Sequence, residues 1–316
     1  MRSHNHHLST CAFVTLTLIW ATLPQPANAE PQCAMVPAFE QTNLNVPGGK
    51  MPIKKTPDGK ALMFTTGLHI NTDGTSRSYK VADFWGEHDA LNNLCNAMSD
   101  ACAGLNQDQL RQRRELTQSA AQAGWPADQL RATRISPSII AHGPDGKPCA
   151  GKEGFLVSAT SLNNPAITDA CNIDRYVDAL EVSALVLPRD PKGGQPSGFT
   201  KHGVKMGDLA AVWLPGSDKV HFAVVGDQGP ANKLGEASIA LNGRLLGKTA
   251  PPVNYLQLRG KKPYQGQDWN VRRANVVVFP GTRDAKLPYM TQERIDEAAS
   301  NFLNYFGGKE KLMFCR

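Results

Sequence analysis

The sequence has few of the features that mark membrane, metal-binding or nucleic-acid-binding proteins. After residue 29 it contains no apolar run long enough to span a bilayer. It has no Cys-x2-Cys or His-x3-His spacing, and the five histidines after residue 29 are scattered, so we expect no metal site. It also has no internal repeats and no long low-complexity tract. These absences leave an ordinary folded domain as the expectation, with no membrane partner.

The charge balance does not indicate a nucleic-acid partner. The chain has 34 Lys and Arg against 28 Asp and Glu, a formal net charge of +6. The basic residues are interspersed with acidic ones and match no known recognition motif. Lys261-Lys262 and Arg272-Arg273 add only local positive density. We therefore expect no nucleic-acid partner.

Residues 1–29 have the pattern of a secretory signal peptide. Arg2 precedes an apolar run from Ala12 to Leu23, and Ala27-Asn-Ala29 supplies small residues for cleavage before Glu30. The apolar run is too short to span a bilayer stably. We therefore expect a secreted protein, extracellular or periplasmic, whose mature chain begins at Glu30.

The cysteines favour disulfide bonds. Cys11 leaves with the signal peptide, and an even number in an exported chain predicts up to three disulfides. The sequence does not choose among the pairings, although Cys95 with Cys102 is the most local. The six remaining cysteines are Cys33, Cys95, Cys102, Cys149, Cys171 and Cys315.

Short apolar runs separated by Gly, Pro and Asn turns predict a mainly β fold of the α+β class. Many short strands of this kind are typical of a sandwich or a barrel, and we favour a closed or partly open β-barrel with a few flanking helices. The predicted strands lie at residues 61–66, 138–141, 155–160, 182–187, 209–213, 220–225, 253–258 and 275–279.

Helices and segment boundaries complete the expected organisation. Residues 106–124 and 291–306 have apolar side chains at helical spacing, and the second helix ends at Gly307-Gly308. Residues 84–134 are charged and poor in strands, which indicates a helical insertion that either caps a cleft or forms a solvated helix pair. Residues 30–60 are predicted to form an extended N-terminal arm. Residues 61–316 are predicted to form a single domain.

The segment 221–241 places a carboxylate on each side of a turn. An apolar strand leads to Asp227, and Glu236 stands before an apolar helix-like stretch, with glycines around both acids. Two carboxylates fixed by one turn suit cleavage of a glycosidic bond. One acid protonates the leaving oxygen, and the other acts as base or nucleophile for attack at the sugar carbon. The alternative is a helix that begins after a surface loop, with two solvated acids.

This segment resembles the glycoside hydrolase family 75 chitosanases and their bacterial relatives. The resemblance covers roughly residues 62–83 and 135–310. It implies that Asp227 and Glu236 are the two essential carboxylates, that no cofactor is needed, and that the reaction is inverting endo-hydrolysis of β-1,4-linked glucosamine polymers. Further matching segments are Phe155–Leu162, Arg175–Asp178, Lys205–Ala210 and Val277–Gly281.

The turn at residues 70–74 resembles the Asp-x-Asp-Gly element of that family, with Asn71 at its first acidic position. Asp73 is predicted to line the sugar cleft, and a plain Asp-Gly hairpin turn is the alternative. A calcium loop is disfavoured because the remaining ligands are missing. The other residues predicted to bond sugar hydroxyls or amines are Thr160, Ser161, Tyr176 and Asp178.

The sequence also suggests a role for each carboxylate. We expect Glu236 in the first turn of a helix that runs through Ile239 and Leu241, where the helix dipole favours the ionised form and hence a base. We expect Asp227, at the end of an apolar strand, to be partly desolvated. Desolvation raises a carboxyl pKa and suits a proton donor.

The expected protein is thus a monomeric, secreted glycosidase whose partner is a polysaccharide, chitosan or a related amino-sugar glycan. The positive net charge is unfavourable for attracting a polycation, which favours an N-acetylated or anionic cell-wall polymer. Two alternatives stay open. One is a non-catalytic polysaccharide-binding protein on the same fold, and the other is a glycosidase that acts on peptidoglycan.

Overall fold

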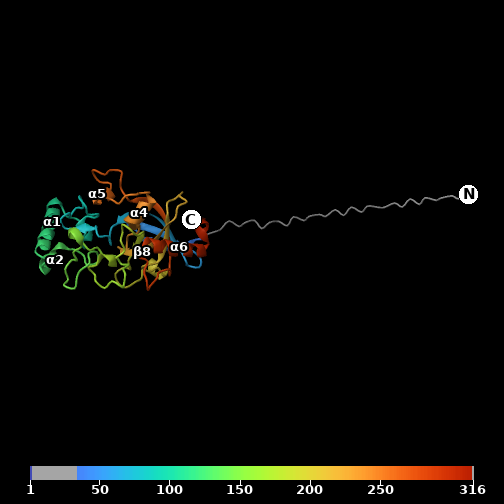
Figure 1. The fold of residues 1–316 in the computed structure, drawn as a ribbon, viewed down its shortest axis with the longest axis horizontal. Helices are drawn as coiled ribbons and strands as arrows, with labels where there is room; N and C mark the ends of the chain where they lie inside the picture. Colours follow the sequence, from blue (N-terminus) through green and yellow to red (C-terminus); the bar gives the residue numbers. More distant parts are fainter. Residues whose placement is uncertain (2–33, 315–316) are drawn as a thin grey trace.

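The computed structural model describes Met1 and residues 34–314, and Figure 1 shows how their elements are arranged. Residues 2–33 and 315–316 lie outside the described part. The predicted signal peptide, the predicted mature end at Glu30, and the cysteines Cys33 and Cys315 fall there.

Six strands close into a β-barrel. They are β3 (Leu62–Asn71), β6 (Ala184–Pro188), β7 (Leu209–Trp213), β8 (His221–Gly229), β9 (Glu236–Ser238) and β10 (Val271–Phe279). Around the barrel they follow the order β3, β10, β7, β8, β6 and β9, and β9 pairs back with β3. The pairs β6–β8 and β3–β9 are parallel, and the other pairs are antiparallel. The predicted mainly β, α+β fold with a barrel is confirmed.

Alternate residues of the strands fill the barrel interior. Leu62, Phe64 and Leu68 of β3 pack with Val276 and Val278 of β10, and all five side chains are buried. This follows from strand geometry, in which successive side chains point to opposite faces. The residues between them face outward, and both sites described below lie on that outer face.

Helix α6 (Gln292–Phe306) covers part of the outer face of the barrel. Its apolar stripe packs against outward-facing residues such as Trp213 and Phe279. Thr291 accepts a hydrogen bond at its N-terminus, and Gly307 ends it with a positive φ of 112°, a conformation that favours glycine. These local signals explain why the predicted helix 291–306 is confirmed. Helix α7 (Gly308–Phe314) follows.

The N-terminal segment widens the sheet beyond the closed barrel. β1 (Val36–Thr42) and β2 (Lys50–Lys55) form an antiparallel hairpin through a short 3-10 helix, η1 (Pro47–Gly49). β2 then pairs with β3, where Lys54 lies opposite Met63. The part of residues 30–60 that the structure describes is therefore largely this hairpin.

A helical region lies at the opposite end of the molecule from α6 (Figure 1). It contains α1 (Gln107–Gln122) and α2 (Ala127–Thr133), in the segment predicted as a helical insertion. Asn106 and Gln109 cap α1 reciprocally, a pattern that is local and readable from sequence. A disulfide joins Cys95 to Cys102, as the most local pairing suggested, and a second joins Cys149 to Cys171.

The remaining elements are short. They are β4 (Tyr79–Lys80) paired with β5 (Phe155–Leu156), α3 (Gly198–Lys201), α4 (Ile239–Leu245), α5 (Tyr255–Leu258), η2 (Leu94–Ala97), η3 (Lys152–Gly154) and η4 (Ile173–Arg175). No helix within residues 34–314 is long and apolar enough to cross a membrane.

Two predicted strands are wrong. Residues 253–258 contain α5, because the Asn254 side chain accepts a hydrogen bond from the Gln257 N–H and so caps a helical turn. Residues 138–141 form no strand, and only an isolated bridge joins Ile140 to Ser158. Strand β5 covers only the first two residues of the predicted 155–160 strand.

Candidate functional site

Asp227 and Glu236 lie at the same level of the barrel. They are on β8 and β9, and Val186 of β6, the strand between these two, separates them. In β8 Asp227 pairs with Val186 of β6, and at the start of β9 Glu236 pairs with the same residue. Directly paired residues point to the same face of a sheet. The neighbouring residues Leu185 and Ala237 belong to the interior cluster, so both carboxylates lie on the outer face.

A β-bulge turns Asp227 outward. Leu185 pairs with Val225 and Val186 with Asp227, so Gly226 is the extra residue of β8. Val225 faces the interior, and strict alternation would have turned Asp227 inward as well. Glycine is required at this bulge because a Cβ on Gly226 would lie 2.8 Å from the Cβ of Ala184.

Glu236 is in a strand, which corrects the predicted helix position. Helix α4 begins at Ile239, where the Ser238 hydroxyl accepts a hydrogen bond from the Leu241 N–H. Residues 236–238 are held extended because β9 pairs on one side with β3 and on the other with β6. The helix dipole therefore gives no reason for Glu236 to act as a base.

Asp227 combines desolvation with three hydrogen bonds to one carboxylate oxygen. Burial raises the pKa of Asp227, whereas the bonds from Ser161 and Gln228 oppose that rise. Its Oδ1 accepts from the Ser161 N–H at 2.9 Å, the Ser161 hydroxyl at 2.7 Å and the Gln228 N–H at 2.8 Å. The expected desolvation is present, and Ser161 lies against the acid that it orients.

Asp73 is a third carboxyl group in the same place. Its Oδ1 accepts hydrogen bonds from the Tyr79 hydroxyl and the Ser158 hydroxyl, each at 2.9 Å. Burial, reinforced by the charge of Asp227, raises the pKa of Asp73 to about 7. The sequence identified Asp73 only as a cleft residue. Its proton affinity depends on Tyr79, Ser158 and Asp227, which only folding brings together.

The tight turn that holds Asp73 packs directly on the chain near Val177. Gly74 has a φ of 91°, and a Cβ there would lie 1.9 Å from the Val177 carbonyl oxygen. The turn is therefore fixed both by its own backbone conformation and by its neighbour. The charge of Asp227 raises the pKa of Asp73 more than the charge of Glu236 does, so Asp73 lies on the Asp227 side of the site.

Glu236 has basic neighbours on its other side. Burial raises the pKa of Glu236 and the charge of Asp227 adds to the rise, whereas the charges of Lys233 and Arg259 oppose it. His69 lies directly opposite Glu236 in the β3–β9 register, and burial together with the same two cations lowers its pKa. The site is thus electrically asymmetric, with cations gathered at Glu236.

Asn71 joins Asp73 to Glu236. Its Oδ1 accepts a hydrogen bond from the Asp73 N–H at 2.9 Å, and its side chain also hydrogen-bonds Glu236, which favours the ionised glutamate. This is the position where the resembled element carries an acid. An aspartate at position 71 could not donate this amide hydrogen bond to Glu236. It would also add a fourth carboxyl group to a site that already contains Asp73, Asp227 and Glu236.

The predicted sugar-binding residues fall into two groups. The Thr160 hydroxyl is buried, donates to the Leu162 carbonyl at 2.7 Å and accepts from the Val177 N–H at 3.1 Å, so its contacts are structural. Tyr176 and Asp178 line a cavity of about 220 Å³ that also reaches Gly74. Burial raises the pKa of Asp178, and the bond from the Leu180 N–H opposes that rise.

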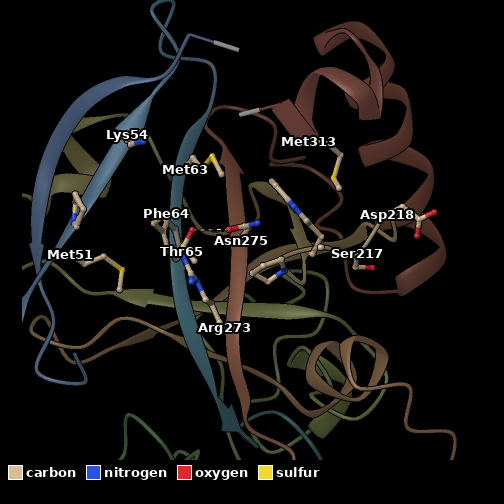
Figure 2. A pocket seen from close by; sticks show the side chains of 14 residues that line it. Met51, Lys54, Met63, Phe64, Thr65, Ser217, Asp218, Arg273, Asn275 and Met313 are labelled. Carbon is tan, nitrogen blue, oxygen red and sulfur yellow. Dashed lines mark hydrogen bonds between the residues drawn. The ribbon is translucent and has the colours of Figure 1, made fainter. Parts of the chain in front are cut away.

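The space beside Asp73 and Asp227 is small. A hollow of about 10 Å³, close to the volume that a single water needs, is lined by Asn71, Asp73, Thr160 and Asp227 among others. A cavity of about 780 Å³ lies elsewhere on the barrel (Figure 2). Within the described residues no group of three or more histidine, cysteine, aspartate or glutamate side chains is placed to hold a metal ion.

Comparisons with models of known protein families and with curated proteins give no match. The resemblance to the family 75 chitosanases therefore stays a prediction.

Proposed function

We propose that this protein is a secreted glycosidase of the family 75 type, which hydrolyses β-1,4 linkages within chitosan or a related amino-sugar polymer. The observation that carries the proposal is the pair Asp227 and Glu236, fixed on either side of Val186 on one face of the barrel. Burial raises the pKa of both acids, which favours proton exchange closer to neutral pH than free carboxyl groups allow. The two disulfides are consistent with an exported protein.

In the proposed reaction Asp227 is the acid and Glu236 the base. Desolvation raises the pKa of Asp227 and so favours a protonated donor at this position. Glu236 has Lys233 and Arg259 near it, and these charges favour the carboxylate. Glu236 would then activate water for attack at the anomeric carbon, while Asp227 gives its proton to the departing oxygen.

The cavity that reaches Gly74, next to Asp73, supports the proposal that a glycan binds here. Asp178 in its wall is a hydrogen-bond acceptor for hydroxyl or ammonium groups. Asp174 and one cation, Lys152, also line this cavity, so its lining has a net negative charge. An amino sugar would satisfy both acids. This supports an amino-sugar polymer over a neutral glucan.

A specific observation favours peptidoglycan as a second candidate substrate. Lys233, Arg259 and His69 gather around Glu236, and neither Lys233 nor Arg259 forms an ion pair within the described residues. A glycan with a carboxylate substituent would be attracted to these cations, whereas a polycation would be repelled. Peptidoglycan strands carry such carboxylates.

The test is release of reducing ends from a panel of chitosans of different acetylation and from peptidoglycan strands. Wild-type protein should cut at least one glycan, and Asp227→Asn and Glu236→Gln should each abolish that cutting. Preference for chitosan supports the first substrate, and preference for peptidoglycan supports the second. Binding of a glycan without release of new ends by the wild type would instead indicate a non-catalytic binding protein and overturn the proposal.

A further inference from the structure

A second cavity of the described chain is a groove on the outer face of the barrel, far from the carboxylates. Its floor is a row across three strands, in which Asn275 of β10 pairs with Thr65 of β3 on one side and with Trp213 of β7 on the other. The groove encloses about 780 Å³, within the size range of small-molecule sites. Along β3, Thr65 precedes Asn71 by six residues, which at roughly 3.3 Å per residue separates the two sites by about 20 Å.

The walls of the groove are apolar and adaptable. Met63 lies on the floor side of the groove, and Met313 of α7 lies at its opposite wall (Figure 2). The turn at residues 215–218 closes one edge of the groove. Methionine side chains are flexible and polarisable, so they fit irregular apolar ligands. Such walls suit the hydrocarbon part of a ligand better than a sugar ring, which needs many polar partners.

The floor of the groove presents hydrogen-bond donors. The Thr65 hydroxyl donates to Asn275 Oδ1 at 2.8 Å, and this bond orients the amide so that its NH₂ group is turned away from Thr65 (Figure 2). No residue of the described chain accepts a hydrogen bond from that NH₂ group. A half-buried amide donor held in one orientation is a ready partner for an acceptor atom of a ligand.

Two cations line the same groove. Arg273 lies near the floor on the same strand as Asn275, and Lys54 lies on β2. Neither side chain forms an ion pair with any described residue. Asp218 is the one acidic residue of the lining, and it lies on the turn side of the groove. Negative charge is therefore favoured near Arg273 and disfavoured near the turn.

We propose that this groove binds a small amphiphilic anion, a molecule with a carboxylate or sulfonate head and an apolar body. Arg273 and the Asn275 NH₂ group hold the head, and Lys54 adds electrostatic attraction. The apolar body lies along Met63 and Met313. The planar guanidinium of Arg273 matches a carboxylate or sulfonate head better than a point charge does. This site does not depend on the proposed glycosidase activity.

The test uses 8-anilinonaphthalene-1-sulfonate, a fluorescent anion with an apolar body, titrated into the folded full chain. We expect saturable binding to one site that Arg273→Gln weakens at least about tenfold, the size expected for loss of a charge-assisted hydrogen bond. Arg272→Gln is the matched control, because Arg272 is the exposed neighbour on the same strand and does not line the groove. It should leave the affinity within about twofold.

Two further measurements locate the dye. Ser217→Trp places a large side chain at the groove edge and should reduce binding as strongly as Arg273→Gln. Decanoate should displace the dye, whereas decanol at the same concentration should not, because it lacks the anionic head. Equal affinities of Arg273→Gln and Arg272→Gln, or unchanged binding in Ser217→Trp, would overturn the proposal. Thermal unfolding of each variant shows whether it is folded, and Asp227→Asn should bind the dye like the wild type.

Discussion

The carboxylate site and the groove, both on the outer face of the barrel, differ in how their charged side chains are held. At the carboxylate end, Asp73 and Asp227 are partly buried, and each holds several hydrogen bonds from neighbours that are themselves fixed. At the groove end, Arg273 and Lys54 are exposed and have no ion-pair partner within the described residues. Desolvated acids cost stability, and the surrounding fold must hold them in place.

The difference explains what each end is suited to do. Acids with raised pKa values that strands and a bulge hold in register are suited to chemistry, which needs fixed geometry and tuned proton affinity. Exposed cations above an adaptable apolar groove are suited to binding, which tolerates movement. The comparison predicts that changes at the carboxylate end alter turnover and pH dependence, whereas changes at the groove end alter neither.

The largest expected effect is the loss of turnover when either carboxylate is neutralised. Asp227→Asn and Glu236→Gln should each lower the rate of reducing-end release by about 100-fold or more, since an acid–base group contributes on this scale. Arg273→Gln should keep the wild-type rate. Near wild-type turnover in either carboxylate variant would remove that residue from the reacting pair.

The next effect concerns the pH dependence of stability. The pKa of Asp73 is raised to about 7 in the folded protein, so the folded state keeps this proton while the unfolded state loses it near pH 4. The free energy of unfolding should therefore fall as pH rises from about 4 to 7. Asp73→Asn should remove this fall, and it should stabilise the protein relative to wild type more at pH 8 than at pH 4.

A rise of about three pKa units corresponds to at most about 4 kcal/mol, and partial exposure of Asp73 reduces the expected difference to about 1–3 kcal/mol. Urea unfolding at several pH values measures it. Asp58→Asn is a control of opposite sign, because hydrogen bonds from Thr56 and from the Lys60 N–H lower the pKa of the exposed Asp58. If Asp73→Asn and wild type keep a constant difference across pH 4 to 8, the raised pKa is excluded.

A smaller effect tests the bulge that turns Asp227 outward. Gly226→Ala brings a Cβ to 2.8 Å from the Cβ of Ala184. We expect a loss of about 1–3 kcal/mol in the free energy of unfolding, typical of overpacking. Adding Ala184→Gly removes the clashing atom, so the double variant should lose less than the two single variants together. Strict additivity in urea unfolding would mean that this contact does not limit the bulge.

The smallest expected effect concerns Ser161. Its hydroxyl donates to Asp227 at 2.7 Å and favours the ionised acid. Ser161→Ala should therefore raise the pKa of Asp227 further and move the alkaline limb of the pH–rate profile to higher pH, if Asp227 is the proton donor. Ser217→Ala, at the groove end, is the matched control and should leave the profile unchanged. A shift of the alkaline limb to lower pH would contradict the assigned role.

The helices show what local sequence signals can predict. The predicted helices at 106–124 and 291–306 correspond to α1 and α6, because Asn106, Thr291 and Gly307 are capping residues that act within one turn. The closeness of Cys95 and Cys102 in sequence likewise made them the most local candidate pair, and the structure joins them. The predicted strand at 253–258 failed because its apolar spacing fits a buried helical turn as well as a strand, and the Asn254 cap decides between them.

The alternating apolar pattern, the helix caps and the acids at 227 and 236 were determined by the sequence alone, since each depends on residues close together in the chain. Tertiary structure decided which strands pair, and with them the bulge at Gly226, the strand position of Glu236 and the meeting of Asp73 with Asp227. It also placed Asn275 between Thr65 and Trp213 to form the groove floor. These features depend on strand register and burial, which join residues far apart in sequence and have no local pattern.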